Sequence, residues 1–271
     1  MPTFWKHQKY ITTWKQFNSI VRSKEAKLLH RLSDFPNCVL VSGCQRSGTT
    51  MLSRIITESD GMVRYWFGPD DELDAALILS GYVGHSPEGR YCFQTTYLNK
   101  HFNEYYDHKT NFTLIWMIRN PNSVIYSLLN NFSDFALNYL YKSFGRQVAT
   151  RMDNFMYSIF GIKGIPKIRR ACHIYVGKSS QIFNLRKNLS PEKLIVVEYD
   201  DLSENKIVVL PELYQQVNLS FKRNYLDKIH AKSLIKHKSL TFRELKTIKK
   251  LCFPVYLKAK ELVTIRSNNF H

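Results

Sequence analysis

Short apolar runs alternate with amphipathic stretches along most of this chain. The runs at residues 39–41, 91–93, 112–118 and 194–199 are rich in β-branched and aromatic residues, which predicts buried strands. Two of these runs are followed by apolar residues at helical spacing, namely Met51, Leu52, Ile55 and Ile56, and then Val124, Ile125, Leu128 and Leu129. This alternation predicts an α/β fold with a central parallel sheet flanked by helices.

The remaining stretches mainly predict helices. Residues 1–35 place Trp, Phe, Ile and Val at roughly helical spacing between lysines, which predicts a basic amphipathic segment ahead of a main domain over 36–271. That segment either packs on the main domain or rests on a membrane, because Trp, Phe and Lys together suit a headgroup layer. Residues 133–189 predict two or three helices with a break at 161–166, and residues 243–263 predict one basic helix.

The junction after the first strand carries a phosphate-binding pattern. Its sequence is Gly43-Cys44-Gln45-Arg46-Ser47-Gly48-Thr49-Thr50. A small-residue loop between a strand and a helix presents backbone N–H groups and the positive end of the helix dipole to an anion. The spacing is close to that of a P-loop, but threonine replaces the lysine that kinases and ATPases need after the second glycine. The loop therefore favours a single 5′-phosphate, and a tight turn without a ligand is the alternative.

A second pattern follows the strand at 112–118. Arg119 stands at the carboxyl end of that strand, and Asn120-Pro121 is a favoured start for the next helix. Ser127 lies about two helical turns further on. An arginine fork and a hydroxyl can together hold a dianionic phosphate. The two patterns, each at a strand-to-helix junction, are far more specific together than either is alone.

Both patterns resemble those of the sulfotransferases that use 3′-phosphoadenylyl sulfate (PAPS). In that family the first loop binds the 5′-phosphosulfate, and an arginine and a serine eight residues apart bind the 3′-phosphate. The resemblance implies a P-loop-NTPase-like three-layer α/β fold. It implies that Arg46 stabilises charge near the bridging oxygen and that Arg119 and Ser127 bind the 3′-phosphate. The residues implied to cradle the 5′-phosphosulfate are Gln45, Arg46, Ser47, Gly48, Thr49 and Thr50.

The same resemblance implies two more nucleotide contacts. Tyr199 ends the run at 194–199 in a sequence similar to a strand end of the family, whose tyrosine lies near the adenine. A buried core tyrosine is the alternative reading. Many members of the family close over the 3′-phosphate with a basic C-terminal loop, and here Lys238 or Lys236 is the candidate donor. A solvated loop is the alternative for that segment.

Sulfuryl transfer to a hydroxyl needs a base that takes the acceptor proton. Cytosolic animal members of the family carry Lys-Thr-His on the strand after the loop, with the histidine as base, whereas this chain has Gln94-Thr95-Thr96 there. Other members use a glutamate downstream of the first helix. Four carboxylates cluster within residues 70–74, and we predict Glu72 as the base, with Asp71 and His85 as the alternatives. Ordinary helix-start acids that face the dipole would look the same.

Composition narrows the class of protein. The net charge of +17 favours an anionic ligand, acceptor, nucleic acid or membrane surface, or is simply a solvated basic face. No apolar run is long enough to predict a membrane-spanning helix. Five scattered cysteines without C-x-x-C spacing fit reduced thiols, and no metal site is predicted. The N-terminus lacks the apolar stretch of a secretory signal, so we expect a cytoplasmic protein, with peripheral membrane contact through residues 1–35 as an option.

The sequence therefore predicts an enzyme that moves a sulfuryl group from PAPS to a hydroxyl or amine of a saccharide, lipid or small molecule. Adenosine 3′,5′-bisphosphate leaves, and no metal is needed. Nucleic acid is not expected as a partner, and the oligomeric state stays open. Two other classes remain. One is a P-loop nucleotide kinase, which needs Mg²⁺ and a lysine at position 49, and the other is a non-catalytic basic protein that binds nucleic acid or membranes.

Overall fold

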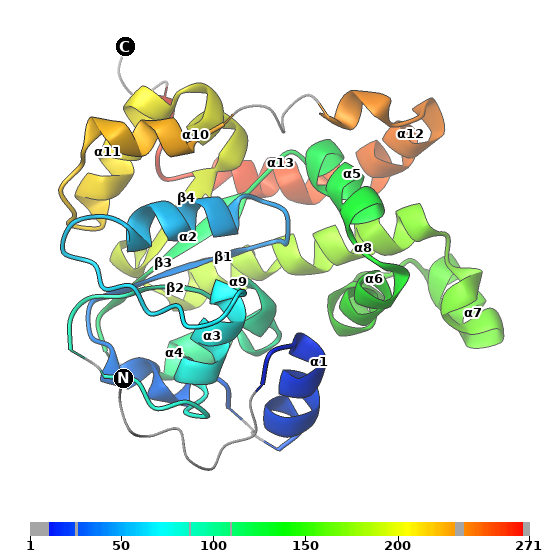
Figure 1. Cartoon of the computed structure of the whole chain (residues 1–271). Helices are drawn as coiled ribbons and strands as arrows, with labels where there is room; N and C mark the ends of the chain where they lie inside the picture. Colours follow the sequence, from blue (N-terminus) through cyan, green and yellow to red (C-terminus); the bar gives the residue numbers. More distant parts are fainter. Residues whose placement is uncertain (1–10, 25–26, 87, 109, 231–235, 268–271) are drawn as a thin grey trace.

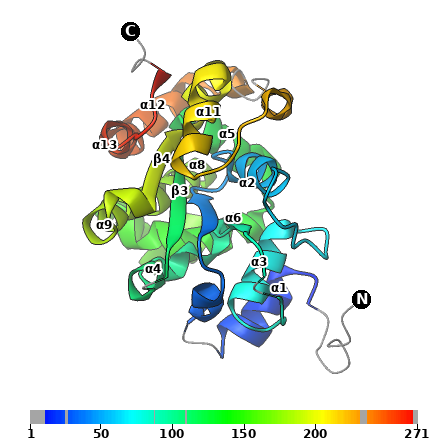
Figure 2. The same cartoon turned by 90° about the vertical axis from the view of Figure 1, so that its left-hand side faces the viewer.

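A four-stranded parallel sheet forms the centre of the molecule. The computed structural model describes residues 11–24, 27–86, 88–108, 110–230 and 236–267. The strand order is β2-β1-β3-β4, and every neighbouring pair is parallel. The strands are β1 (Cys38–Gly43), β2 (Cys92–Gln94), β3 (Phe112–Ile118) and β4 (Leu194–Glu198). Helices lie on both sides of this sheet (Figure 1, Figure 2), which confirms the predicted three-layer α/β fold.

Most of the chain outside the sheet is helical. The α-helices are α1 (Trp14–Phe17), α2 (Thr49–Thr57), α3 (Asp71–Leu79), α4 (Glu104–Asp107), α5 (Pro121–Asn131), α6 (Asp134–Leu140), α7 (Arg151–Phe160), α8 (Lys167–Ser179), α9 (Gln181–Asn188), α10 (Tyr199–Glu204), α11 (Lys206–Gln216), α12 (Phe242–Leu251) and α13 (Phe253–Glu261). Short π and 3₁₀ turns connect several of them.

Side-chain alternation along β1 explains the two helical layers. Leu40 belongs to a buried cluster that includes α3 and the N-terminal residues, whereas Val39 and Val41 belong to a cluster with α2, α10 and α11. Successive residues of a strand point to opposite faces of the sheet. An apolar run in β1 therefore needs cover on both faces, and each layer supplies it on one side.

The N-terminal segment differs from the predicted continuous helix. Its described residues form α1, a π-helical turn at Asn18–Arg22 and a 3₁₀ turn at His30–Asp34, and residues 1–10 lie outside the described part. The N–H groups of Leu28 and Leu29 donate to a carboxylate oxygen of Glu104 at 2.8 and 2.7 Å. Helical spacing cannot reveal this tertiary anchor. Because the apolar residues from 11 to 35 are buried with the main sheet, the described segment packs on the main domain.

Two other helical predictions differ in detail. The single basic helix predicted over 243–263 is two helices, α12 and α13, with Pro254 in the first turn of the second. Proline disfavours helical geometry in the residue before it and lacks an N–H, so the chain turns there. Residues 133–189 hold four α-helices rather than two or three, although the predicted break coincides with a 3₁₀ turn at Gly161–Gly164.

The carboxyl ends of all four strands meet at one edge of the sheet because the strands are parallel. The loop into α2 follows β1 at this edge, the turn into α5 follows β3, and α10 follows β4. A third buried cluster, built from α5, α6, α8 and α12, lies outside the two sheet layers. In open α/β sheets, ligands bind outside the carboxyl ends of the strands. The fold therefore brings both predicted phosphate motifs to the edge where a ligand is expected.

Candidate active site

Two glycines shape the loop between β1 and α2. A Cβ atom on Gly43 would lie 2.4 Å from the carbonyl oxygen of Met117, and a Cβ atom on Gly48 would lie 2.1 Å from the ring of Tyr199. Their φ angles are +147° and +86°. Only a residue without a side chain adopts these angles at such close approach without strain. The glycines therefore let the loop run against its neighbours.

Polar side chains inside this loop are buried without an internal partner. Gln45 is 4% exposed and Ser47 is 0% exposed, and neither side chain hydrogen-bonds to another described residue. Gly48 is the N-cap residue of α2, so no side chain caps the first N–H groups of that helix. Buried polar groups in proteins normally have partners. The loop thus gathers donors that an anionic ligand would satisfy.

Arg46 connects the loop to the second motif. Its Nε donates to the hydroxyl of Ser127 in α5 at 2.7 Å. Its carbonyl oxygen accepts a hydrogen bond from Nη1 of Arg119 at 2.9 Å. The structure therefore brings Arg46, Arg119 and Ser127 together from the loop, the end of β3 and α5. The two patterns, whose residues are 73 and 81 positions apart in sequence, form one cationic site.

The surroundings of Arg119 hold it at the edge of the sheet. Tyr175 of α8 donates its hydroxyl to the Arg119 carbonyl oxygen at 2.9 Å, and the guanidinium carbon lies 4.1 Å from the centre of the Tyr199 ring. Burial lowers the pKa of Arg119, whereas the nearby Tyr199 and Asp200 raise it. An arginine remains protonated in proteins. Arg119 therefore provides a buried, oriented positive charge beside the loop.

Of the two further nucleotide contacts that the resemblance implies, Tyr199 is buried beside the loop and Lys238 is exposed. The Tyr199 ring packs between Gly48 and Arg119 at the start of α10, so it lies within the candidate site. Lys238 is exposed, in a 3₁₀ turn at Lys236–Ser239 that lies beside α5. The side chain of Lys236 lies outside the described residues.

Three of the four clustered carboxylates cap a helix, pair with an arginine or anchor a loop. Asp70 is the N-cap of α3, accepts from the N–H groups of residues 72 and 73, and also accepts from Nε1 of Trp14 at 2.9 Å. Asp71 forms a two-pronged ion pair with Arg54, at 2.9 and 3.2 Å. Asp74 accepts the N–H groups of residues 67 and 68. These contacts give helix-start and loop-anchoring roles to the neighbours of Glu72.

Glu72 is buried and hydrogen-bonded at both carboxylate oxygens. One oxygen accepts from Nε2 of Gln94 at 3.0 Å, and the other accepts from the backbone N–H of Tyr97. Burial raises its pKa well above the ordinary value of 4.5, and the charges of Asp70 and Asp71 act in the same direction. The Tyr97 N–H and the positive charge of Lys178 oppose that rise. A carboxylate with a raised pKa is suited to take a proton near neutral pH.

A cavity of about 340 Å³ joins the loop to Glu72. Its lining includes Arg46, Thr49 and Thr50 from the loop and α2, together with Glu72 and Gln94. The hydroxyl of Thr96, which also lines the cavity, is buried without a hydrogen-bond partner among the described residues. The cation, the phosphate loop and the candidate base thus face one space.

Sequence reasoning missed several residues around Glu72. Gln94 donates to Thr49 at 3.2 Å as well as to Glu72, and so connects α2 to the candidate base. Lys178, buried in α8, donates to the carbonyl oxygen of Thr96 and lies 4.4 Å from the centre of the Phe144 ring. Burial lowers the pKa of Lys178. Lys178 lies in a helix of mixed apolar and basic residues, so its position in the sequence does not predict that it is buried; the structure shows it.

The N-terminal segment also contributes to the site. The Trp14 ring stacks on Tyr97 with centroids 4.7 Å apart, and Nη2 of Arg22 donates to the Tyr97 carbonyl oxygen at 2.9 Å. Tyr97 is the residue whose N–H binds Glu72. The N-terminal segment therefore holds Tyr97, a residue that lines the cavity, in addition to packing in the core.

His85 lies away from this cavity. Its ring packs against Phe35 and Tyr91, near the amino ends of β1 and β2. Among the aromatic residues at 132–160, Phe132 lines the cavity, Tyr141 and Phe144 are in the buried core, and Phe155 is exposed. The aromatic stretch is therefore divided between the cavity, the core and the surface.

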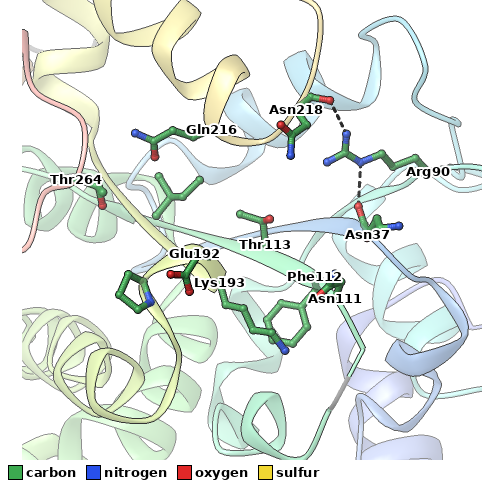
Figure 3. A pocket seen from close by; sticks show the side chains of 12 residues that line it. Asn37, Arg90, Asn111, Phe112, Thr113, Glu192, Lys193, Gln216, Asn218 and Thr264 are labelled. Atoms are coloured by element: carbon green, nitrogen blue, oxygen red, sulfur yellow. Dashed lines mark hydrogen bonds between the residues drawn. The ribbon is translucent and has the colours of Figure 1, made fainter.

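A larger cavity of about 770 Å³ opens at the opposite edge of the sheet (Figure 3). It is lined near the amino ends of β3 and β4 by residues such as Phe112 and Lys193, and Arg90 donates there to the carbonyl oxygens of Asn37 and Asn218, both at 2.9 Å. Its lining includes no residue of either phosphate motif. The 340 Å³ cavity is therefore the one that belongs to the candidate site.

No group of three or more His, Cys, Asp or Glu side chains in the described part of the chain is placed to hold a metal ion. No helix among the described residues is long and apolar enough to cross a membrane.

Comparisons with known proteins place the fold. The sequence matches no protein-family model and no curated protein. Among solved structures, a sulfotransferase domain from the curacin biosynthetic pathway is 16% identical with a TM-score of 0.50, over 84% of this chain and 91% of that domain. A sulfotransferase domain from the Synechococcus PCC 7002 olefin synthase is 15% identical with a TM-score of 0.48, over 83% and 94%. Mouse sulfotransferase SULT7A1, crystallised with PAP, is 11% identical with a TM-score of 0.45, over 86% and 92%. At these identities the likeness concerns the backbone, and on the curacin comparison this chain has the fold of a sulfotransferase domain.

Proposed function

We propose that this chain is a sulfotransferase that moves a sulfuryl group from PAPS to a hydroxyl or amine of a small acceptor. The observation that carries the proposal is the meeting of Arg46, Arg119 and Ser127 beside a cavity that also contains Glu72. A donor with phosphates at two positions needs two anion sites at a fixed spacing. The loop at residues 43–50 supports one of them, and Arg119 with Ser127 supports the other.

Each residue has a part in the proposed reaction. The acceptor oxygen forms a bond to sulfur while the bond from sulfur to the bridging phosphate oxygen breaks, and the acceptor proton passes to Glu72. Adenosine 3′,5′-bisphosphate is the leaving group. Arg46, as a permanent cation, stabilises the charge that develops on the bridging oxygen, and the amides and hydroxyls of the loop stabilise the 5′-phosphate. The protein thus acts by positioning, charge and one proton transfer.

The surroundings of Glu72 support its role as base. Asp71 is paired with Arg54, and His85 lies near the amino ends of the strands. Glu72 lines the cavity, has a raised pKa, and accepts hydrogen bonds from a side-chain amide and a backbone N–H rather than from a cation. Its two hydrogen-bond donors hold the carboxylate in one orientation. A fixed base within a buried cavity is what efficient proton removal needs.

The polar lining of the cavity favours an acceptor with several hydrogen-bonding groups. The hydroxyl of Thr96 is buried without a partner among the described residues, and it lines the cavity. Buried polar groups that lack partners disfavour an apolar ligand, because they would remain unpaired. We therefore propose a compact polar acceptor, such as a saccharide or another polyhydroxylated small molecule.

The test is turnover of the donor. The full-length protein is incubated with PAPS, without added metal, against a panel of saccharides, phenols, amines and lipids, and released adenosine 3′,5′-bisphosphate is measured together with the sulfated product. We expect release that depends on both an acceptor and Glu72, being lost in Glu72→Gln. Consumption of ATP that depends on Mg²⁺, with no use of PAPS, would instead support a nucleotide kinase and overturn the proposal.

A further inference from the structure

Helix α7 projects from the body of the molecule (Figure 1), and several of its apolar side chains are exposed. Met152, Phe155 and Ile159 recur at spacings of three and four residues, which places them on one side of the helix. Their exposed fractions are 65%, 58% and 54%, and Phe160 at the end of the helix is 58% exposed. Single exposed apolar residues need no explanation, but a contiguous stripe of them on one helix indicates a contact surface.

The other side of α7 is fixed to the molecule. Asp153 is buried and accepts two hydrogen bonds from Arg169 of α8, both at 2.6 Å, and it lies 2.7 Å from Nε2 of His173. The guanidinium of Arg146 lies 3.9 Å from the centre of the Tyr157 ring. These contacts define which way the helix faces. The apolar stripe is therefore a fixed outward feature of the fold.

Cations lie at both ends of the stripe. Residues 141–170 contain seven Lys and Arg but one Asp or Glu, and that one is the buried Asp153. Arg151 in the first turn of α7 and Lys163 just beyond its end are both exposed. No carboxylate of the described residues forms a salt bridge with either of them. The surface therefore combines an apolar stripe with unpaired cations at both ends.

The charge restricts what can cover this surface. A symmetric pair of copies would bring the same positively charged side of two molecules together, and like charges at a contact are unfavourable. The partner should therefore be anionic and also able to accept apolar side chains. Neither the 340 Å³ cavity nor the 770 Å³ cavity is lined by α7, and the helix projects from the body of the molecule (Figure 1). A projecting apolar stripe with flanking cations is typical of helices that lie in a lipid headgroup layer.

We propose that α7 docks this protein on the surface of an anionic lipid bilayer. Met152, Phe155 and Ile159 would enter the boundary between the headgroups and the acyl chains, while Arg151 and Lys163 would contact acidic headgroups. This places the contact on a different segment from residues 1–35, whose described apolar side chains are buried in the core. The proposal is independent of the sulfotransferase reaction.

The test is flotation of the full-length protein with vesicles of phosphatidylcholine alone and with added phosphatidylserine. We expect binding to the vesicles that contain phosphatidylserine, weakened by salt because the cations contribute. Phe155→Ser with Ile159→Ser should reduce the vesicle affinity at least about tenfold, since two apolar side chains no longer leave water. Arg151→Gln with Lys163→Gln should weaken binding and reduce its salt dependence.

Matched controls come from exposed residues elsewhere. Ile207→Ser on α11 and Leu257→Ser on α13 remove apolar side chains that are 70% and 55% exposed, and Arg186→Gln with Lys187→Gln on α9 removes two exposed cations. These variants should bind vesicles like the wild type, and the melting temperature of every variant verifies folding. The single variants Phe155→Ser and Ile159→Ser serve if the pair does not fold.

Three results would overturn the proposal. One is the absence of binding to anionic vesicles, and another is vesicle binding that the α7 substitutions leave unchanged. The third is self-association in sedimentation velocity that Phe155→Ser with Ile159→Ser abolishes, because α7 would then be an interface between copies. Binding of an acidic protein to α7 without any vesicle binding would also overturn the proposal, because the surface would then bind a protein partner.

Discussion

Lys178 and Glu72 bind opposite ends of one peptide group. The ammonium group of Lys178 donates to the carbonyl oxygen of Thr96, and the N–H of the same peptide, at Tyr97, donates to a carboxylate oxygen of Glu72. A cation bound to a carbonyl polarises the amide and strengthens its N–H as a donor. Burial raises the pKa of Glu72 and lowers that of Lys178. Because the two groups have opposite charges, each one opposes the shift that burial causes in the pKa of the other. Lys178 therefore supports the ionised form of Glu72 through this peptide.

The substitution Lys178→Met tests this relationship. It removes a positive charge that lowers the pKa of Glu72, so that pKa should rise further. The pH profile of turnover should then move to higher pH, on the order of one pH unit. Turnover at neutral pH should fall, while the affinity for adenosine 3′,5′-bisphosphate should change little. The measurement is the pH dependence of kcat with saturating donor.

Lys193→Met is a matched control for that experiment. Lys193 also donates to a backbone carbonyl oxygen, that of Thr110, and lies 5.0 Å from the centre of an aromatic ring, that of Phe112. It lines the cavity at the far edge of the sheet, so its removal should leave the pH profile in place. If Lys178→Met lowers the melting temperature but does not move the pH profile, Lys178 acts on stability alone.

Glu72→Gln should separate catalysis from donor binding. A positioned base contributes roughly 10²- to 10⁴-fold to turnover, so a loss in that range is expected. The affinity for adenosine 3′,5′-bisphosphate should be within about twofold of the wild type, because Glu72 contacts Gln94 and Tyr97 rather than the phosphate loop. Asp71→Asn is the comparison. If Asp71→Asn loses more turnover than Glu72→Gln at equal folding, the assignment of the base is wrong.

The raised pKa of Glu72 also predicts how stability varies with pH. Below its ordinary pKa of 4.5 the carboxyl is neutral in both the folded and the unfolded chain. As pH rises from there toward the raised pKa, the unfolded chain loses the proton while the folded chain keeps it, so folding stability falls. Glutamine cannot ionise, and therefore the melting temperature of Glu72→Gln relative to the wild type should increase steadily from pH 5 to pH 8. A difference that does not vary with pH would show that the pKa of Glu72 is not raised.

Gly48→Ala tests the close approach of the loop to Tyr199. The new Cβ atom would collide with the ring, and the positive φ angle adds strain of roughly 1–2 kcal/mol. Gly61→Ala is a matched control, since Gly61 has φ +80° but open space where the Cβ atom would stand. We expect Gly61→Ala to lose stability by about this backbone amount. Gly48→Ala should lose more and should also weaken nucleotide binding, which calorimetric titration measures.

Local chemistry decided how much of the fold was predictable. The strands at 112–118 and 194–199 and the two strand-to-helix junctions were predicted because apolar runs, glycines and Asn-Pro act within a few residues. The N-terminal segment is helical at residues 14–22 and in a 3₁₀ turn at His30–Asp34, but it is not one continuous helix. Between these turns Glu104, some 75 residues away, binds the N–H groups of Leu28 and Leu29. Pro254 could have predicted the break between α12 and α13, but apolar residues continue at helical spacing on both sides of it, which favoured a single helix.

The candidate site shows the same division. The loop and Arg119 carry patterns that can be read along the chain, and the structure brings them together with Ser127. The setting of Glu72 depends on Gln94, Tyr97 and Lys178, which come from three separate elements. Their relation is made by packing, and no spacing in the sequence encodes it. The roles of these residues remain predictions for the experiments above.

The central claim is that Arg119 and Ser127 recognise a 3′-phosphate on a nucleotide held by the loop. The most direct measurement is calorimetric titration of adenosine 3′,5′-bisphosphate and of AMP into the wild type, Arg119→Ala and Ser127→Ala, with ATP and Mg²⁺ as a further ligand. We expect the wild type to bind the bisphosphate roughly 10- to 100-fold more tightly than AMP, because charge-assisted hydrogen bonds hold the additional phosphate. Arg119→Ala should abolish this preference. Equal affinity of the wild type for the bisphosphate and AMP, or tighter binding of ATP with Mg²⁺, would contradict it.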